Sequence, residues 1–176
     1  MKYPIFYLLF FSFSLALFRI IPHPPNFTPV LSVAIMAPLI LRNKVYGSAI
    51  PIIAMFLSDI ILGFHVYQIV VYSTILIISF VAPLNKNYFF IFTMCFGSSL
   101  FFYLTTNFAV WLFWDYYPKT IEGLISCYYL AIPFFKNTLL STFFYTGLLM
   151  IIYKYLVILN DNTNNFIESV LRFVRK

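Results

Sequence analysis

Long apolar runs alternate with short polar breaks along the whole chain. Such runs predict transmembrane helices, each of which needs roughly 20 residues to cross a bilayer. The six expected helices cover residues 4–20, 29–42, 46–63, 66–84, 88–113 and 137–159. The second run is the shortest and contains Pro38, so we expect that helix to be kinked or tilted. The pattern predicts an all-α integral membrane protein with about six transmembrane helices.

The composition agrees with a membrane protein. The chain has 176 residues, of which 62% are hydrophobic and 9% charged, and its mean hydropathy is +0.93. So little charge excludes a soluble domain. The net charge of +6 does not indicate nucleic-acid binding, because the basic residues are dispersed along the chain. We expect one transmembrane domain over residues 1–159 and an amphipathic, basic cytoplasmic tail over residues 160–176.

The lysines and arginines predict how the chain is oriented. With both termini inside (N-in/C-in), eight basic residues fall on the inner face of the membrane and three on the outer face, which satisfies the positive-inside rule. The long connection 114–136 contains an apolar piece that we expect to form an interfacial or re-entrant helix on the outer side. A seventh span is the alternative, but it would move the basic tail outside. Lys2 and the apolar run after it could pass for a signal peptide, although no convincing cleavage site follows.

A proline-rich segment, residues 19–29, separates the first two runs. Four prolines within eight residues exclude a helix there, since each removes a backbone donor and restricts the residue before it. Inside a membrane such backbone persists only where it is packed in protein or lines a wet cavity. We therefore expect this turn, with His23 and Asn26, to form the wall or lid of a ligand site at the outer face.

Charged and titratable residues gather at the same face. Asp59 lies about one turn from the outer end of the third run, and Arg19 lies at the outer end of the first. A carboxylate at this depth is costly unless it is paired or faces water. An Arg19–Asp59 pair would either lock two helices together or contact a ligand. His23 and His65 could reach a ligand, a metal or each other, although each also fits an ordinary hydrogen-bonded turn.

The fifth run ends in a stripe of polar and aromatic residues. Tyr103, Asn107, Trp111 and Asp115 recur every four residues, so they share one helical face. Asn107 must bond another helix or a ligand, because lipid would leave its amide unsatisfied. Trp111 could stack on a planar ligand or belong to the interfacial aromatic belt.

The last run offers fewer signals. Asn137 can cap the helix that we expect to begin there, and Lys136 can meet an acidic side chain, a ligand anion or solvent. Cys95 is expected to be a small buried hydrophobe, whereas Cys127 lies on the outer side. Neither cysteine has a metal-type spacing. The sequence carries no hydrolytic triad, phosphate loop or dinucleotide fingerprint, so we expect neither an enzyme nor a bound cofactor or metal.

Four stretches of the chain resemble a known family. They are PHPPNFTPV, LSDIILGFH, TTNFAVW and YPKTIEGLISCYYLAIPFFKNTL. They look like bacterial membrane proteins of the DUF6580 family, to which a transport role is attributed, and the likeness runs over about residues 19–147. The plan is similar to substrate-binding S-components of energy-coupling-factor (ECF) vitamin transporters. That likeness implies an S-component-like bundle, both termini inside, with a ligand site under outer loops.

The S-component likeness has consequences for particular residues. It implies that the loops at 22–29 and 114–136 close over the ligand, and that Asp59, His65, Asn107 and Trp111 line its site. A solitary subgroup imports cobalamin without a dedicated coupling module. For cobalamin, His23, His65 or Cys127 would qualify by position as a cobalt ligand. Ser12 and Ala16 match only partly the small residues with which S-components dock on a shared ECF energising module.

Two functions of different classes follow from these observations. The first is a multi-pass transport protein of the inner (plasma) membrane that binds a vitamin or vitamin-like metabolite, with cobalamin as one candidate, from the outer face and mediates its uptake. Its candidate ligand-binding residues are Arg19, His23, Asn26, Asp59, His65, Tyr103, Asn107, Trp111 and Lys136. The second is a structural accessory subunit of a larger membrane complex, in which Arg19 and Asp59 only lock helices and no enclosed cavity is expected.

Overall fold

The described part of the chain forms six α-helices. The computed structural model describes the backbone of residues 4–85 and 87–174, and the side chains of residues 8–85 and 87–155. The helices are α1 (Pro4–Ile20), α2 (Val30–Leu41), α3 (Lys44–Leu62), α4 (Gln68–Val81), α5 (Tyr88–Phe113) and α6 (Ile121–Val174). No strand occurs in the described backbone. The all-α class expected from the apolar runs is therefore confirmed.

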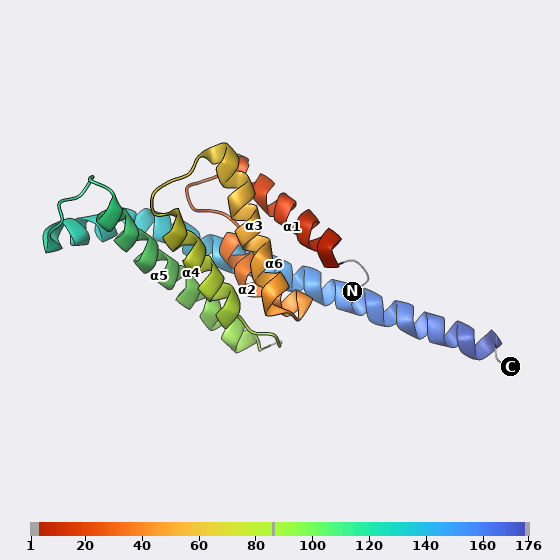
Figure 1. Ribbon diagram of the computed structural model, residues 1–176. Helices are drawn as coiled ribbons and strands as arrows, with labels where there is room; N and C mark the ends of the chain where they lie inside the picture. The colour runs from red at the N-terminus through yellow and green to blue at the C-terminus, as the bar shows by residue number, and fades with distance from the viewer. Residues whose placement is uncertain (1–3, 86, 175–176) are drawn as a thin grey trace.

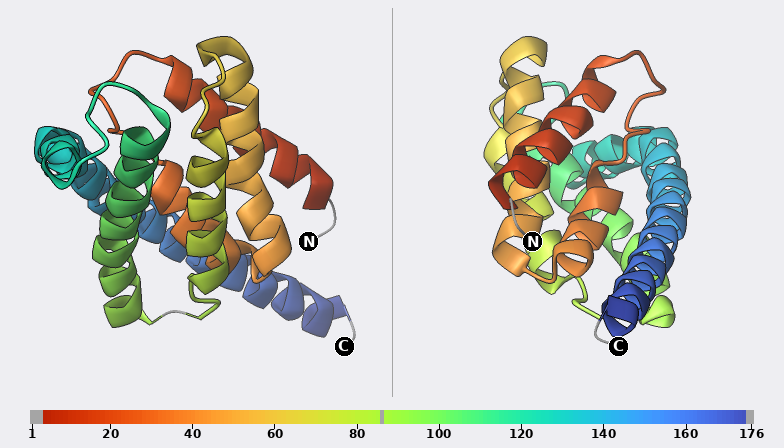
Figure 2. Two further views of the ribbon diagram at one scale, coloured as in Figure 1. Left: turned by 60° about the vertical axis from the view of Figure 1, so that its left-hand side comes forward. Right: turned by 90° about the vertical axis from the view of Figure 1, so that its right-hand side faces the viewer.

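Three loops meet at one end of the helix bundle. The loops 21–29, 63–67 and 114–120 lie together there, away from the start of α1 and the end of α6 (Figure 1 and Figure 2). The turns that follow α2 and α4 lie at the opposite end. We call the first of these ends the loop end. The proline-rich segment thus lies beside two other connections that are distant in sequence.

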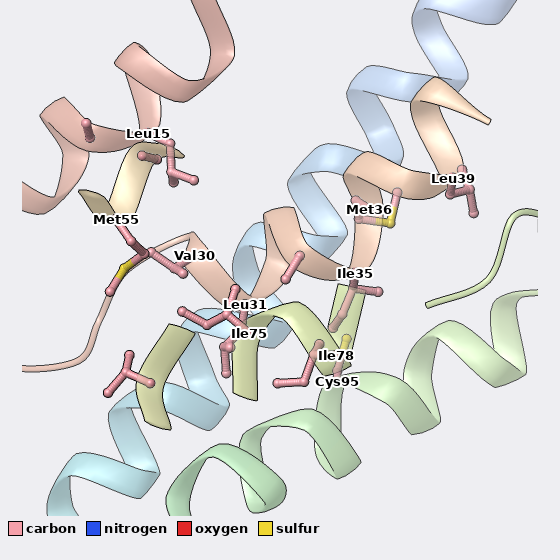
Figure 3. Packing of buried hydrophobic residues seen from close by; sticks show 14 of the residues in the cluster. Leu15, Val30, Leu31, Ile35, Met36, Leu39, Met55, Ile75, Ile78 and Cys95 are labelled. Atoms are coloured by element: carbon pink, nitrogen blue, oxygen red, sulfur yellow. The ribbon is translucent and has the colours of Figure 1, made fainter. Parts of the chain in front are cut away.

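Helix α2 forms the centre of the packing. It contacts α3, α4, α5 and α6, and nine of its 12 residues are buried, so it has no lipid-facing side of any width. Figure 3 shows Leu31 of α2 near Ile75 of α4, and Ile35 of α2 near Ile78 of α4 and Cys95 of α5. Cys95 is a small buried hydrophobe, as expected. At 1.5 Å per residue α2 is about 18 Å long, well short of a bilayer core of about 30 Å.

The junction between α2 and α3 explains how the two helices approach closely. Arg42 ends α2 with φ 51°, and the Asn43 side chain caps α3 by accepting from the Tyr46 amide at 3.0 Å. One turn later, a Cβ added at Gly47 would lie 2.4 Å from the Pro38 Cα. Only glycine lets these two backbones pack so closely.

Membrane-spanning character is clearest for three helices. Within the described residues, α3, α5 and the segment Ile121–Tyr155 of α6 are long and apolar enough to cross a bilayer. The apolar parts of α1, α2 and α4 are shorter. The length and composition of the helices thus support a membrane protein and do not by themselves fix the number of spans.

The last helix departs from the sequence-based prediction. Residues 114–136 were expected to hold a separate interfacial or re-entrant helix, but α6 begins at Ile121 and continues through Pro133 to Val174. Asn137 is therefore inside a helix and does not cap one. The actual N-terminal signal is Thr120, whose hydroxyl accepts from the Gly123 amide at 3.2 Å. The side chains that would make the tail 160–176 amphipathic lie outside the described residues.

Candidate ligand-binding cavity

A cavity of about 730 Å³ lies at the loop end. Residues of all six helices and of the three loops contribute to its lining. A second cavity, lined by Met36, Met150 and neighbouring side chains, has a volume of only about 30 Å³. Ligand sites usually enclose about 300–1,000 Å³. The first cavity therefore has the size of a small-molecule site, and the second does not.

The proline-rich turn forms one wall of this cavity. Within the turn, the Phe27 amide donates to the Pro24 carbonyl at 2.9 Å, and Asn26 adopts φ 61°, which asparagine tolerates better than most residues. Two side chains of α6 fasten the turn from the other side. The Asn137 amide donates to the Pro25 carbonyl at 3.0 Å, and the Ser141 hydroxyl donates to the Asn26 carbonyl at 3.4 Å. The backbone of an irregular segment is thus partly satisfied by α6.

A buried ion pair lies beneath the turn. Arg19 Nη1 donates to Asp59 Oδ1 at 2.7 Å and to the Met55 carbonyl at 3.2 Å, as well as to the Ser58 hydroxyl. The Asp59 side chain is only 2% exposed, whereas that of Arg19 is 17% exposed and faces the cavity. The expected Arg19–Asp59 pair is therefore present, but Asp59 does not line the cavity.

Two residues of α4 complete the shell around Asp59. Gln68 Nε2 and the Tyr72 hydroxyl donate to Asp59 Oδ2 at 2.6 Å and 2.7 Å. Gln68 Oε1 also accepts from the His65 amide at 3.3 Å, which ties the loop 63–67 to the same group. Neither residue was singled out from the sequence. An amide and a hydroxyl four residues apart in an apolar run were the signal that could have identified them.

The opposite wall is formed where α5 packs on α6. The Tyr103 hydroxyl donates to the Tyr128 carbonyl at 2.6 Å, and the Asn107 amide donates to the Tyr103 carbonyl at 2.7 Å. The Cys127 thiol donates to the Asn107 carbonyl at 3.4 Å. Tyr103, Asn107 and Cys127 all line the cavity. Asn107 is therefore satisfied within its own helix and can still present its amide to the cavity.

Aromatic rings surround the part of the cavity nearest the loop end. The rings of His65 and Tyr67 lie 4.1 Å apart, and those of Tyr67 and Trp114 lie 5.7 Å apart. All three residues line the cavity. Trp111, for which ligand stacking and the interfacial aromatic belt were the alternatives, does not line the cavity. It donates its indole N–H to the Pro118 carbonyl at 3.0 Å and holds the loop 114–120. The planar surface is present, but Trp114 provides it.

The cavity brings together most of the residues expected from the sequence. Those that line it are Arg19, His23, Asn26, His65, Tyr103 and Asn107. Asp59, Trp111 and Lys136 do not line it, and Lys136 is exposed on α6. The polar lining contributed by the middle of α6, which comprises Thr138, Ser141 and Thr142, was not expected from the sequence. These residues lie about three to four turns after Cys127, on a helix whose true start was not recognised.

The charges around the cavity are not balanced. No aspartate or glutamate is found among its described lining residues, whereas Arg19, His23 and His65 all contribute. Burial lowers the pKa of His65; the Asp59 carboxylate opposes this shift and Arg19 adds to it. Burial thus favours the neutral form of His65. In the part of the chain that the structure describes, no three His, Cys, Asp or Glu side chains form a group that could hold a metal ion.

Comparison with known proteins identifies the family of this chain. A search of curated proteins and a search of solved structures each found no similar chain. The family model described as "Family of unknown function (DUF6580)" matches residues 1–164, which include all five loops and the whole cavity lining. The chain therefore belongs to the DUF6580 family.

Proposed function

We propose that this protein is a multi-pass transport protein of the inner (plasma) membrane, which binds a vitamin-sized metabolite from the outer face and mediates its uptake. The observation that carries this proposal is the cavity of about 730 Å³ beneath the proline-rich turn. Its volume lies within the usual range for ligand sites. Irregular backbone at membrane depth is expected only where it is packed in protein or lines such a cavity.

The orientation we propose is N-in/C-in, with all six helices forming an S-component-like bundle in the membrane. The loop end would then face outward. The described basic residues at the opposite end include Arg42, Lys44 and Lys154, and the positive-inside rule favours the cytoplasm for that end. A ligand would enter between the proline-rich turn and the loop 114–120.

The way the turn is held suggests how the site could open and close. Among the residues whose side chains are described, only two hydrogen bonds, from Asn137 and Ser141, join the backbone of the turn to α6, and the longer of them is 3.4 Å. The Phe27 ring adds contacts with Phe144 and Tyr145 at centroid distances of 6.4 Å and 5.9 Å. A turn with so few attachments can move without unfolding a helix. We propose that it closes over the ligand, and that the ligand then crosses by reorientation of the protein or by transfer to a partner.

The exposure of Ser12 and Ala16, two small residues of α1, indicates whether α1 could dock on a partner protein. Ser12 and Ala16 are 0% and 3% exposed, and α1 packs against α3. They are therefore covered by this chain's own helices and do not offer a docking surface. This favours a solitary transporter over one that docks on a shared ECF energising module through α1. Cobalamin belongs to the proposed ligand class, and for it the cobalt ligand would be His23, His65 or Cys127, all of which line the cavity.

A thermal-shift screen of the detergent-purified protein against vitamins and corrinoids tests this function. A ligand that binds only the folded state stabilises it by about 2.7 kcal/mol at a concentration of 100 Kd. The blocking variant is Ala131→Phe, because Ala131 is buried on α6 and lines the cavity. Its control is Ile132→Phe, which adds the same ring on an exposed neighbouring position.

The expected result is a concentration-dependent rise in Tm that Ala131→Phe abolishes and Ile132→Phe retains. A well-folded protein that no compound stabilises would favour the structural alternative, an accessory subunit of a larger complex. The same holds for a rise that survives in Ala131→Phe, since binding would then occur outside the cavity.

A further inference from the structure

Arg19 has more hydrogen-bonding capacity than its neighbours use. A guanidinium carries five N–H donors in a fixed plane. Every hydrogen bond that the described residues accept from Arg19 comes from Nη1. Nε and Nη2 have no partner among them, and neither nitrogen is among the buried, unsatisfied side-chain atoms. The free edge of the guanidinium is therefore accessible from the cavity that Arg19 lines.

Asp59 accepts no hydrogen bond from the Nε–Nη2 edge of Arg19. Its Oδ1 accepts from Arg19, while its Oδ2 is occupied by Gln68 and Tyr72. The carboxylate is thus shared among three donors and is sealed behind the cavity wall. It holds the guanidinium in place from one side and leaves the other side open, as a positioning residue does at a bidentate anion site.

The rest of the lining also favours a negative group. The described lining residues include no carboxylate, and Arg19 is the one among them that stays charged at any physiological pH. Apart from it, the nearby wall offers neutral donors and apolar surface. An anion entering this space meets no like charge and one fixed cation.

We propose that the ligand carries an anionic group, a carboxylate or a phosphate, which binds the free Nε–Nη2 edge of Arg19. This inference rests on the proposed function, because it assigns the chemical class of that cavity's ligand. The anionic group could belong to a soluble metabolite or to a lipid headgroup, and the test below separates these sources.

The experiment compares matched pairs of compounds that differ in the anionic group. The probes are nicotinate with nicotinamide, biotin with biotinamide, and pyridoxal 5′-phosphate with pyridoxal, each tested by thermal shift on the full-length protein in detergent. Phosphatidylglycerol and phosphatidylcholine form a lipid pair. The expected result is a larger rise in Tm with at least one soluble anion than with its neutral counterpart.

The matched variant is the double substitution Arg19→Gln with Asp59→Asn. It removes both charges of the pair together, so neither is left uncompensated at this site, and amide groups preserve much of the hydrogen bonding. Hydrogen bonds to a charged group suggest that affinity for the anion falls about ten- to hundredfold, while affinity for the neutral counterpart is unchanged. Size-exclusion chromatography confirms that the variant is folded.

Three other outcomes would each contradict a different part of the two proposals. If the neutral compounds bind as well as the anions, and Ala131→Phe abolishes that binding, the anion inference is wrong and the proposed function stands. If phosphatidylglycerol alone stabilises the protein in an Arg19-dependent way, the anion site is supported, but it is a lipid site and the uptake of a soluble metabolite is contradicted. If no compound in either set binds, both proposals fail.

Discussion

The buried carboxylate of Asp59 gives the sharpest stability prediction. Asp59→Ala removes one ion-pair partner and three accepted hydrogen bonds at a site where the Asp59 side chain is 2% exposed. Breaking a buried pair from one side costs about 3–5 kcal/mol. Arg19 keeps the Met55 carbonyl and the Ser58 hydroxyl and is open to the cavity, so the lower limit applies. We therefore expect a loss of about 3 kcal/mol.

A double-mutant cycle measures the coupling free energy between Arg19 and Asp59. Arg19→Gln, Asp59→Asn and their combination are unfolded with SDS in mixed micelles, with tryptophan fluorescence as the signal. The loss of stability in the double variant should be smaller than the sum of the two single losses by about 1.5–3 kcal/mol. The reason is that each single variant leaves the other charge uncompensated. The reasoning is refuted if the losses simply add within about 0.5 kcal/mol, since the two residues would then not be energetically coupled.

Two further predictions concern packing and orientation. Gly47→Ala should destabilise the protein by about 1–3 kcal/mol in the same unfolding assay, because its Cβ would lie 2.4 Å from the Pro38 backbone. The control Gly97→Ala has no atom within 4 Å of the added carbon and should be neutral or slightly stabilising; equal losses would contradict the close α2–α3 approach. In intact cells a membrane-impermeant maleimide should label Thr28→Cys at the loop end, but should label Asn85→Cys, at the opposite end, only after lysis. The reverse pattern would overturn the N-in/C-in orientation.

Several features could be predicted because they depend on what single residues or short segments require of their surroundings. A carboxylate in an apolar run is costly unless it is paired or faces water, and the similar depth of Arg19 and Asp59 made their pairing possible. The proline-rich turn likewise had to line a cavity or be packed in protein, and it does both. His23 and Asn26 therefore line the cavity, as was expected.

The parts that were missed depend on tertiary packing. The connection 114–136 was expected to hold a helix of its own, but a membrane helix can continue past a proline such as Pro133 where neighbouring groups satisfy the freed backbone, and α6 does so. Because the start of α6 was placed too late, Thr138 and Thr142 were not recognised as cavity residues. Trp111 was favoured over Trp114 because it shares a helical face with Asn107, but the fold of the loop 114–120 decides that the ring of Trp114 lines the cavity.

The most direct test of the central claim is protection of a cysteine placed inside the cavity. Thr28→Cys, on the wall formed by the proline-rich turn, is labelled with the maleimide while the ligand that raises Tm is titrated. We expect labelling to slow with a half-maximal ligand concentration equal to the Kd derived from the thermal shifts, while labelling of Asn85→Cys is unaffected. If the ligand raises Tm and leaves Thr28→Cys fully reactive, the ligand binds elsewhere and the cavity is not its site.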